Sequence, residues 1–404
     1  MNFISKIIFF TTILIIVANI NYFSNVINYV KAQMDFNYKI NTNLYNLEKS
    51  DSFQNYNKNN NRNFKLFTLA ENNCGNDSHC ENKQHQNGKI LGSYDSSLSE
   101  QINTKNSCNE NKLCFNAANN NGYISNSIKS NLIQNTRSNN EKCNDSQCFN
   151  SANNNANILS NKSDSEPGNS GSYSNQNINQ NNQCNNNTEC KNKGTNTAVT
   201  INSQNSGINQ ELKQANKNFN DFSSLYDSIR LPLNNAFSNM GSNKGNLLSN
   251  INSKINQNID QANSCDSSST CSDNSSNKGT IIHSNNSQIS QRIDQNNACL
   301  LDSNCSNRAF NVDTINGNDN NIKNKIINQR NVCLINSECS NKGNTDSNKY
   351  TDNNNQRNVC ILGSICNTNG KGSTTIGLLE ANCSNNDANN RKVCIGGPVN
   401  LSIY

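Results

Sequence analysis

The feature that most constrains the fold is a strict alternation of residue types between Ile289 and Asn311, on both sides of a pair of cysteines. Side chains two residues apart lie on the same face of an extended strand. The sequence therefore predicts two strands joined by a turn, with the cysteines meeting where the chain reverses. The predicted shared face carries Ile289, Gln291, Ile293, Gln295, Asn297 and Cys299 on the way in, and Cys305, Asn307, Ala309 and Asn311 on the way out.

The chain has 18 cysteines, an even number that suits complete pairing in an oxidising compartment. Seven neighbouring pairs enclose five residues each, and a helix would hold such cysteines about 9 Å apart, beyond the reach of a disulfide. A chain reversal brings them together. The predicted disulfides are Cys74/Cys80, Cys108/Cys114, Cys143/Cys148, Cys184/Cys190, Cys265/Cys271, Cys299/Cys305, Cys333/Cys339, Cys360/Cys366 and a wider terminal pair, Cys383/Cys394.

The cysteine pairs recur at a nearly fixed interval. A spacing of 34 residues separates Cys74 from Cys108, Cys265 from Cys299, and Cys299 from Cys333. Such a period is typical of repeat proteins whose units stack in sequence. The repeated pattern is I-x-Q-x-I-x-Q-x-N-x-C, a five-residue turn, and then C-x-N-x-(A/G)-x-N.

One segment between the cysteine pairs has a different pattern. Hydrophobic residues at Ile208, Leu212, Ala215, Phe219, Phe222, Tyr226 and Ile229 step by four and three, which indicates a helix. Pro232 would end it. We expect one inserted helix at about Ile208–Arg230; the alternative is a degenerate repeat that has lost its bridge.

Only 32% of the residues are hydrophobic and 16% are charged, so a conventional apolar core is difficult to assemble. Single buried amides are costly, but amides stacked in register bond to the same amide in the layers above and below. The expected fold is therefore all-β: a disulfide-stapled β-solenoid of strand-turn-strand repeats with a period of about 34, partly disordered. The alternative is a largely disordered secreted chain with local disulfide loops.

The N-terminus has the features of a signal peptide. Lys6 precedes the apolar run Ile7–Ala18, which is short for a membrane span, and Val30-Lys31-Ala32 suits cleavage before Gln33. An uncleaved anchor is the alternative. The predicted segments are a signal peptide at 1–32, a flexible Asn-rich arm or imperfect cap at 33–63, Cys-pair repeats at 64–206, a helical insert or degenerate repeat at 207–254, Cys-pair repeats at 255–366 and a C-terminal cap at 367–404.

The repeat resembles the curlin repeat of secreted amyloid fibre subunits, whose strand-turn-strand units carry inward Gln, Asn, Ala and small apolar residues. The matching positions are Ile289, Gln291, Asn307 and Ala309 and their equivalents in about 64–200 and 255–366. The resemblance implies a stacked architecture and self-association. The longer repeat and the cysteine-bridged turn depart from the family pattern.

No residue is nominated as catalytic, metal-binding or cofactor-binding. The histidines His79, His85 and His283 lie outside any triad or HExxH pattern, and the Cys74/Cys80 spacing lacks the tight pair of a zinc knuckle. The run 370–374, GKGST, fails the phosphate-loop pattern because Gly372 follows the lysine.

The sequence therefore predicts an exported protein and not an enzyme, with a structural or interaction role at the cell surface or in extracellular matrix, fibres included. Its expected partners are its own copies or cell-surface components. The formal charge of +5, or +3 once Lys6 and Lys31 are removed with residues 1–32, and the lack of a clustered basic stripe argue against nucleic acid. The alternative from another class is an extracellular module that binds carbohydrate, mineral or ice through an array of Asn, Ser and Thr.

Overall fold

A computed structural model describes residues 38–395, and most side chains between Lys65 and Leu378. Within 38–395 it leaves out Asn144 and residues 46–48, 60–62, 74–78, 92–96, 109–112, 126–130, 160–170, 185–187, 202–205, 219–234, 249–251, 266–267, 283–285, 317–321, 347–351, 370–372, 379–381 and 386–390. The predicted signal peptide, 1–32, lies outside the described residues. The described strands belong to the compact unit Lys39–Tyr404, and its first strand begins at Tyr38.

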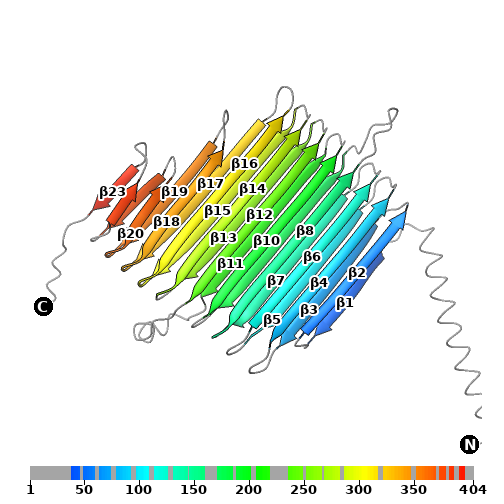
Figure 1. Cartoon of the computed structure of the whole chain (residues 1–404), viewed down its shortest axis with the longest axis horizontal. Helices are drawn as coiled ribbons and strands as arrows, with labels where there is room; N and C mark the ends of the chain where they lie inside the picture. Colours follow the sequence, from blue (N-terminus) through cyan, green and yellow to red (C-terminus); the bar gives the residue numbers. More distant parts are fainter. Residues whose placement is uncertain are drawn as a thin grey trace, which may run out of the picture. The chain divides into compact units, whose positions relative to one another are not determined.

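The described residues form two parallel β-sheets, and successive strands of the chain alternate between them (Figure 1). The first sheet contains β1 (Tyr38–Tyr45), β3 (Asn63–Asn73), β5 (Ser97–Ser107), β7 (Asn131–Cys143), β9 (Tyr173–Cys184), β11 (Gly207–Asn218), β13 (Lys254–Cys265), β15 (Gln288–Leu300), β17 (Ile322–Leu334), β19 (Asp352–Ile361), β21 (Ser373–Leu378) and β23 (Arg391–Ile395). The second contains β2 (Lys49–Asn59), β4 (Cys80–Leu91), β6 (Leu113–Ser125), β8 (Gln147–Leu159), β10 (Glu189–Ile201), β12 (Ala236–Leu248), β14 (Thr270–Ile282), β16 (Asn304–Asn316), β18 (Glu338–Asp346), β20 (Ile365–Asn369) and β22 (Asn382–Asn385).

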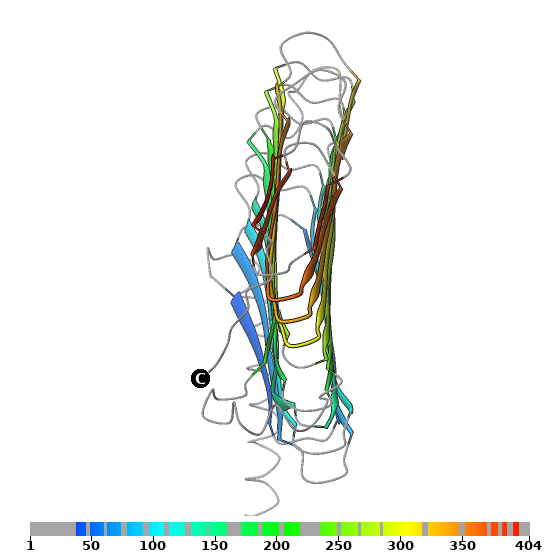
Figure 2. The ribbon, with the colours of Figure 1, turned by 90° about the vertical axis from the view of Figure 1, so that its left-hand side faces the viewer.

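The two sheets face each other (Figure 2), and each strand-turn-strand unit forms one rung of a solenoid. Every strand hydrogen-bonds to the strand two places along the chain, so equivalent residues of consecutive repeats lie side by side. Ile289 on β15 is aligned with Ile255 on β13, and Cys305 on β16 with Cys271 on β14. The predicted all-β, disulfide-stapled solenoid with a period of about 34 residues is confirmed.

The core lies between the facing sheets and is filled by alternate residues of each strand. The whole inward series predicted for Ile289–Asn311 is buried. Branched apolar side chains stack in one column, and small residues opposite them let the returning strand approach closely. At Gly194, an added Cβ would lie 2.7 Å from the Leu212 side chain. That apolar column contains Ile178, Leu212, Ile259, Ile293 and Ile327.

The predicted inserted helix is wrong for Gly207–Asn218, which forms β11 and pairs with both β9 and β13. A step of four residues, as from Ile208 to Leu212, keeps two side chains on one face of a strand as well as of a helix. Only the three-residue step to Ala215 distinguishes the two, and Ala215 faces outward. The segment is the degenerate repeat; residues 219–230 of the expected helix lie outside the described part.

Both ends of the solenoid extend further than expected. The segment 33–63, expected to be a flexible arm or an imperfect cap, contains β1 and β2, and β2 pairs with β4, so it supplies a rung. Beyond residue 366, the short strands β21–β23 continue both sheets in register. In the described residues the segment predicted as a cap is therefore a continuation of the repeat by shorter strands.

In the part of the chain that the structure describes, no helix has the length and apolar character to cross a membrane. The same residues form strands, in contrast to the alternative of a largely disordered chain.

Candidate functional site: the side-chain columns and the outer face

The predicted cysteine pairs lie at the turns, where a strand of the first sheet passes into a strand of the second. Their Cα atoms are 6.0 to 6.7 Å apart, within the range for disulfides. Cys80 is also disulfide-bonded, but Cys74 lies outside the described residues. The bridges that the structure describes are Cys108–Cys114, Cys143–Cys148, Cys184–Cys190, Cys265–Cys271, Cys299–Cys305, Cys333–Cys339 and Cys360–Cys366.

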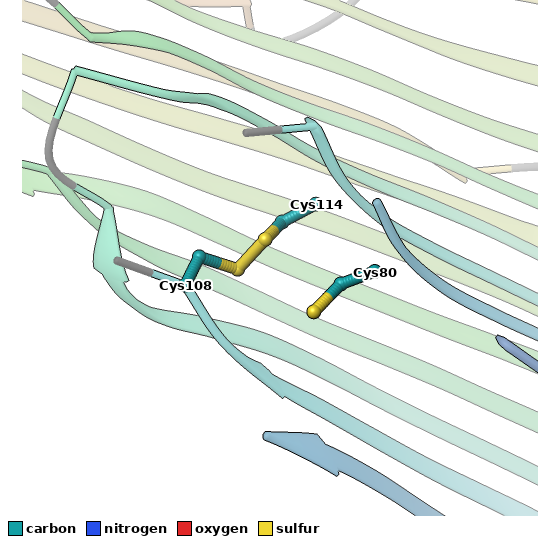
Figure 3. A group of neighbouring side chains, drawn as sticks. All are labelled: Cys80, Cys108 and Cys114. Atoms are coloured by element: carbon teal, nitrogen blue, oxygen red, sulfur yellow. A yellow bond between two sulfur atoms is a disulfide. The ribbon is translucent and has the colours of Figure 1, made fainter. Parts of the chain in front are cut away.

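The bridges of neighbouring rungs stack on one another. Figure 3 shows Cys80 beside the Cys108–Cys114 bridge, and the three sulfur atoms lie within 4.8 Å of one another. Such groups would suit a soft metal as thiolates, but a disulfide sulfur is not a thiolate. In the disulfide-bonded state, the stacked cysteines hold together the two strands that meet at each turn. The pair Cys383/Cys394 stays a prediction; in backbone register Cys383 follows Cys366, and Cys394 follows Gly377.

One rung interrupts the cysteine column with an aromatic side chain. Phe237 on β12 is aligned with Cys190 and with Cys271, and it is buried among the cysteines. On β11, Asn218 is aligned with Cys184. Seventeen residues, 219–235, separate β11 from β12, whereas a bridged turn encloses five or fewer. Phe237 therefore fills the volume that a disulfide occupies in the rungs on either side.

Asparagine side chains form columns that run from rung to rung beside the cysteines. Asn116 Nδ2 donates to Asn150 Oδ1 of the next rung at 3.0 Å, and Asn150 Nδ2 donates to Asn192 Oδ1 at 3.0 Å. The facing column on the first sheet interlocks with this one: Asn182 Nδ2 donates to Asn192 Oδ1 at 3.1 Å. The stacking of amides in register, predicted from the sequence, is confirmed.

Asp273 breaks the chemistry of the asparagine column. Its Oδ1 accepts hydrogen bonds from Asn239 Nδ2 and Asn263 Nδ2, at 2.9 and 2.7 Å. Its Oδ2 occupies the place of an amide NH2 and has no hydrogen-bond partner among the described residues, although Asn307 of the next rung is aligned with it. Burial raises the pKa of Asp273 well above its usual value. A protonated Asp273 can donate where the missing amide would.

In a glutamine column on the first sheet, the hydrogen bonds all point the same way along the solenoid, and the column ends in charged residues. Each glutamine donates to the preceding rung, as Gln176 Nε2 does to Gln134 Oε1 at 2.8 Å. Gln134 Nε2 donates in turn to Glu100 Oε2 at 2.6 Å, so Glu100 is the accepting end, and burial raises its pKa to about 8. At the other end Lys325 is aligned with Gln291, and its Nζ lies 2.7 Å from Asp313 Oδ1, with both side chains buried.

A column of hydroxyls at the turns was not anticipated from the sequence. The backbone N–H of Ser303 donates to Ser337 Oγ at 3.2 Å, and Ser337 Oγ donates to Leu334 O at 2.8 Å. These contacts satisfy the backbone where the strands end. The sequence contains a signal for this column, because a serine lies two residues before the second cysteine of several pairs. These serines are Ser146, Ser269, Ser303, Ser337 and Ser364.

The histidines and the lysine-containing loop do not gather into a site in the described residues. His79 is exposed, with Nε2 4.0 Å from Glu81 Oε2. His85 lies on the outer face of β4, where burial lowers its pKa. His283 and residues 370–372 lie outside the described part, and Ser373 and Thr374 are in β21.

In the described part of the chain, open hollows occur where small residues lie side by side on the outer faces. One, of about 360 Å³, lies on β4, β6 and β8 around Ala117 and Ser151. Another, of about 310 Å³, lies on the first sheet around Ala215 and Ala262, where Arg137 and Lys213 face Asp260. Burial and the neighbouring Asp294 raise the pKa of Asp260.

This geometry defines a class: a parallel two-sheet β-solenoid with interior amide columns and, in the described residues, disulfides at most of the turns that lead from a first-sheet strand to the following second-sheet strand. Comparisons with protein-family models, curated proteins and solved structures found no match.

Proposed function

We propose that this chain is an exported structural protein, a disulfide-stapled scaffold that acts outside the cell, at the surface or in extracellular matrix. One observation carries the proposal: side chains stack from rung to rung in hydrogen-bonded columns, as from Asn116 to Asn150 to Asn192. Interior residues used in this way hold the rungs together and are not available for chemistry on a substrate. We accordingly propose that the chain is not an enzyme.

The cysteine bridges support the extracellular location. Disulfides persist in oxidising compartments and are rare where thiols are kept reduced. The apolar run Ile7–Ala18 after Lys6 supplies the means of export as a signal peptide. The bridges also compensate for the small apolar core, because each short loop contributes roughly 2 kcal/mol in the chain-entropy model.

We propose self-association as the main interaction, with fibres as one form of it. The resemblance to curlin repeats supports this, and so do the parallel strands at the ends of the sheets, which present backbone groups to another strand. β2 and β22 are the end strands of the second sheet in the described residues.

Circular dichroism and amyloid-dye binding of the oxidised protein, repeated after reduction, test the scaffold. We expect a β spectrum in the oxidised state and lower thermal stability after reduction. Dye binding together with filaments in electron micrographs would support fibres; a β spectrum without filaments would leave a monomeric scaffold. A random-coil spectrum of the oxidised protein would refute the proposal.

Peptide mapping under non-reducing conditions tests the local pairing. Each bridge should join the two cysteines of one turn, and the map should also contain Cys74–Cys80 and Cys383–Cys394. Disulfides between different rungs would contradict the proposed pairing within each turn.

A further inference from the structure

One rung of the solenoid has a lysine and an aspartate at two facing positions of its core. Lys325 on β17 is aligned with Gln291 of the preceding rung, and Asp313 on β16 is aligned with Gly279. An added Cβ at Gly279 would lie 3.3 Å from Gln291 Nε2, so these two positions face each other across the interior. The rung of Lys325 therefore carries an amine and a carboxyl where the preceding rung carries an amide and a glycine.

The amine and the carboxyl are in contact and are shielded from water. Lys325 Nζ lies 2.7 Å from Asp313 Oδ1, and each of the two side chains is 1% exposed. By contrast, Lys105 and Glu141 form an ion pair at 3.0 Å with side chains that are 41% and 31% exposed. Two opposite charges in a dry core keep little of the solvation that stabilises them in water. Loss of both charges in a chemical step is therefore more favourable for the buried pair than for the exposed one.

The second oxygen of the Asp313 carboxyl faces another amine. Asp313 Oδ2 has no hydrogen-bond partner among the described residues, and Lys323 Nζ lies 3.6 Å from it. Lys323 is two residues before Lys325 on β17, so both side chains lie on the inward face of the strand. An ammonium in this place stabilises negative charge that develops on Oδ2.

We propose that Lys325 and Asp313 join in an amide bond, a covalent cross-link between β16 and β17. A proton passes from Lys325 Nζ to Asp313 Oδ1, and the uncharged Nζ then attacks Cγ. Negative charge forms on Oδ2 beside Lys323. The bond between Cγ and Oδ1 breaks, and Oδ1 leaves as water with a second proton from Nζ. One water is lost, and nothing is oxidised or reduced. The folded chain holds the two groups together, which replaces their encounter in solution.

The cross-link closes the rung at the edge opposite its disulfide. Cys299–Cys305 joins β15 to β16 where β16 begins, whereas Asp313 lies toward the other end of β16 and reaches β17. The rung is then tied covalently at both edges. Unlike the disulfide, the amide survives reduction, and its formation does not depend on where the protein acts.

Tryptic mass spectrometry of the full chain tests the cross-link. The protein is purified in its folded, oxidised form and is then reduced, denatured and digested. Trypsin does not cut after a lysine whose Nζ is part of an amide. Peptide 309–323, which contains Asp313, should be joined to peptide 324–330, with a mass below their sum by one water. Neither peptide contains cysteine, so no disulfide can join them.

Lys325→Arg should give the two regions as separate peptides, because the guanidinium stays protonated and does not attack the carboxyl. Circular dichroism checks that this variant is folded. The matched internal control is the exposed pair Lys105 and Glu141, whose peptides should be unlinked in the same digest.

Free peptide 309–323 and complete cleavage after Lys325 in the unaltered chain would show a buried ion pair and overturn the proposal. A link that persists in Lys325→Arg would assign the reaction to another lysine. Equal linkage of Lys105 to Glu141 would mean that burial does not select the reacting pair. None of these results bears on the scaffold itself, which is tested separately by its β spectrum.

Discussion

At the scale of single residues, an inward amide is stable here only because the neighbouring rung presents the same amide. An asparagine both donates and accepts along its column, so a column of identical residues leaves few groups unpaired. An acid at such a position changes the ratio of hydrogen-bond donors to acceptors in the column, because an ionised carboxylate accepts but cannot donate. Asp273 and Glu100 are the two buried acids whose column positions make this difference measurable.

Replacing Asp273 with asparagine should stabilise the protein at neutral pH by about 1 to 3 kcal/mol, because asparagine supplies the donor without binding a proton that the unfolded chain releases at this pH. The pKa of Asp273 is raised in the folded state, so the folded protein binds this proton more tightly than the unfolded chain. Its contribution to stability is therefore fully present at low pH and is lost as the pH rises above the ordinary aspartate value. The advantage of Asp273→Asn should grow over that range.

Urea unfolding at several pH values measures this effect. Asn239→Asp is the matched control, because it places a second acid in the same column and should make stability fall more steeply with pH. If Asp273→Asn and the unaltered chain gave parallel curves of stability against pH, protonation of Asp273 on folding would be excluded.

Glu100 makes a second pH-dependent contribution of the same sign. Because burial raises its pKa from 4.5 to about 8, its contribution is present below pH 4.5 and declines until about pH 8. Glu100→Gln should flatten the curve over this interval, since glutamine also accepts the hydrogen bond from Gln134. Thermal unfolding from pH 4 to pH 9 checks it.

Glu141→Gln is the control for Glu100, because Glu141 forms a partly exposed ion pair with Lys105 at 3.0 Å, and such pairs contribute at most about 1 kcal/mol. An unchanged pH profile in Glu100→Gln would show that this carboxyl does not titrate on unfolding.

At the scale of strands and turns, the sequence was sufficient to predict the strands wherever period-two alternation was uninterrupted, as at Ile289–Asn311. It was ambiguous where hydrophobic residues were four apart, because Ile208 and Leu212 satisfy both a strand and a helix. Alignment with Ile255 and Ile259 of the next rung resolves that choice, and this depends on register between strands, which a single stretch does not contain.

The hollow on the outer face of β4, β6 and β8 was harder to predict for a related reason. Ala117 and Ser151 form this hollow only because their strands are adjacent in register and have lysines on both sides. The turn serines were a missed signal of a simpler kind, because their spacing from the cysteines was visible along the chain.

Phe237 provides the test at this scale, because it replaces a bridge with packing. Phe237→Ala should lower the free energy of unfolding by about 3 to 5 kcal/mol through the cavity it leaves. Phe237→Leu, which retains most of the apolar volume, should lower it less. Urea denaturation of the oxidised variants gives both values; equal losses would mean that Phe237 does not fill the gap in the cysteine column.

At the scale of the whole solenoid, stability should vary with position, because each rung is bonded only to the rungs beside it. A central rung such as β11 and β12 has two neighbours, whereas the end strands have one, and the last strands are also short: β22 has 4 residues and β13 has 12. Terminal rungs are therefore expected to open more often than central ones.

Hydrogen exchange of the oxidised protein, followed by mass spectrometry, should show the slowest backbone exchange in β7–β16 and progressively faster exchange toward β1 and β23. Phe237→Ala should add an internal region of fast exchange at β11 and β12 while the rungs around β5 and β17 stay protected, because coupling passes only between adjacent rungs. Uniform exchange across all strands, or a loss of protection throughout the variant, would mean instead that the rungs unfold as a single cooperative unit.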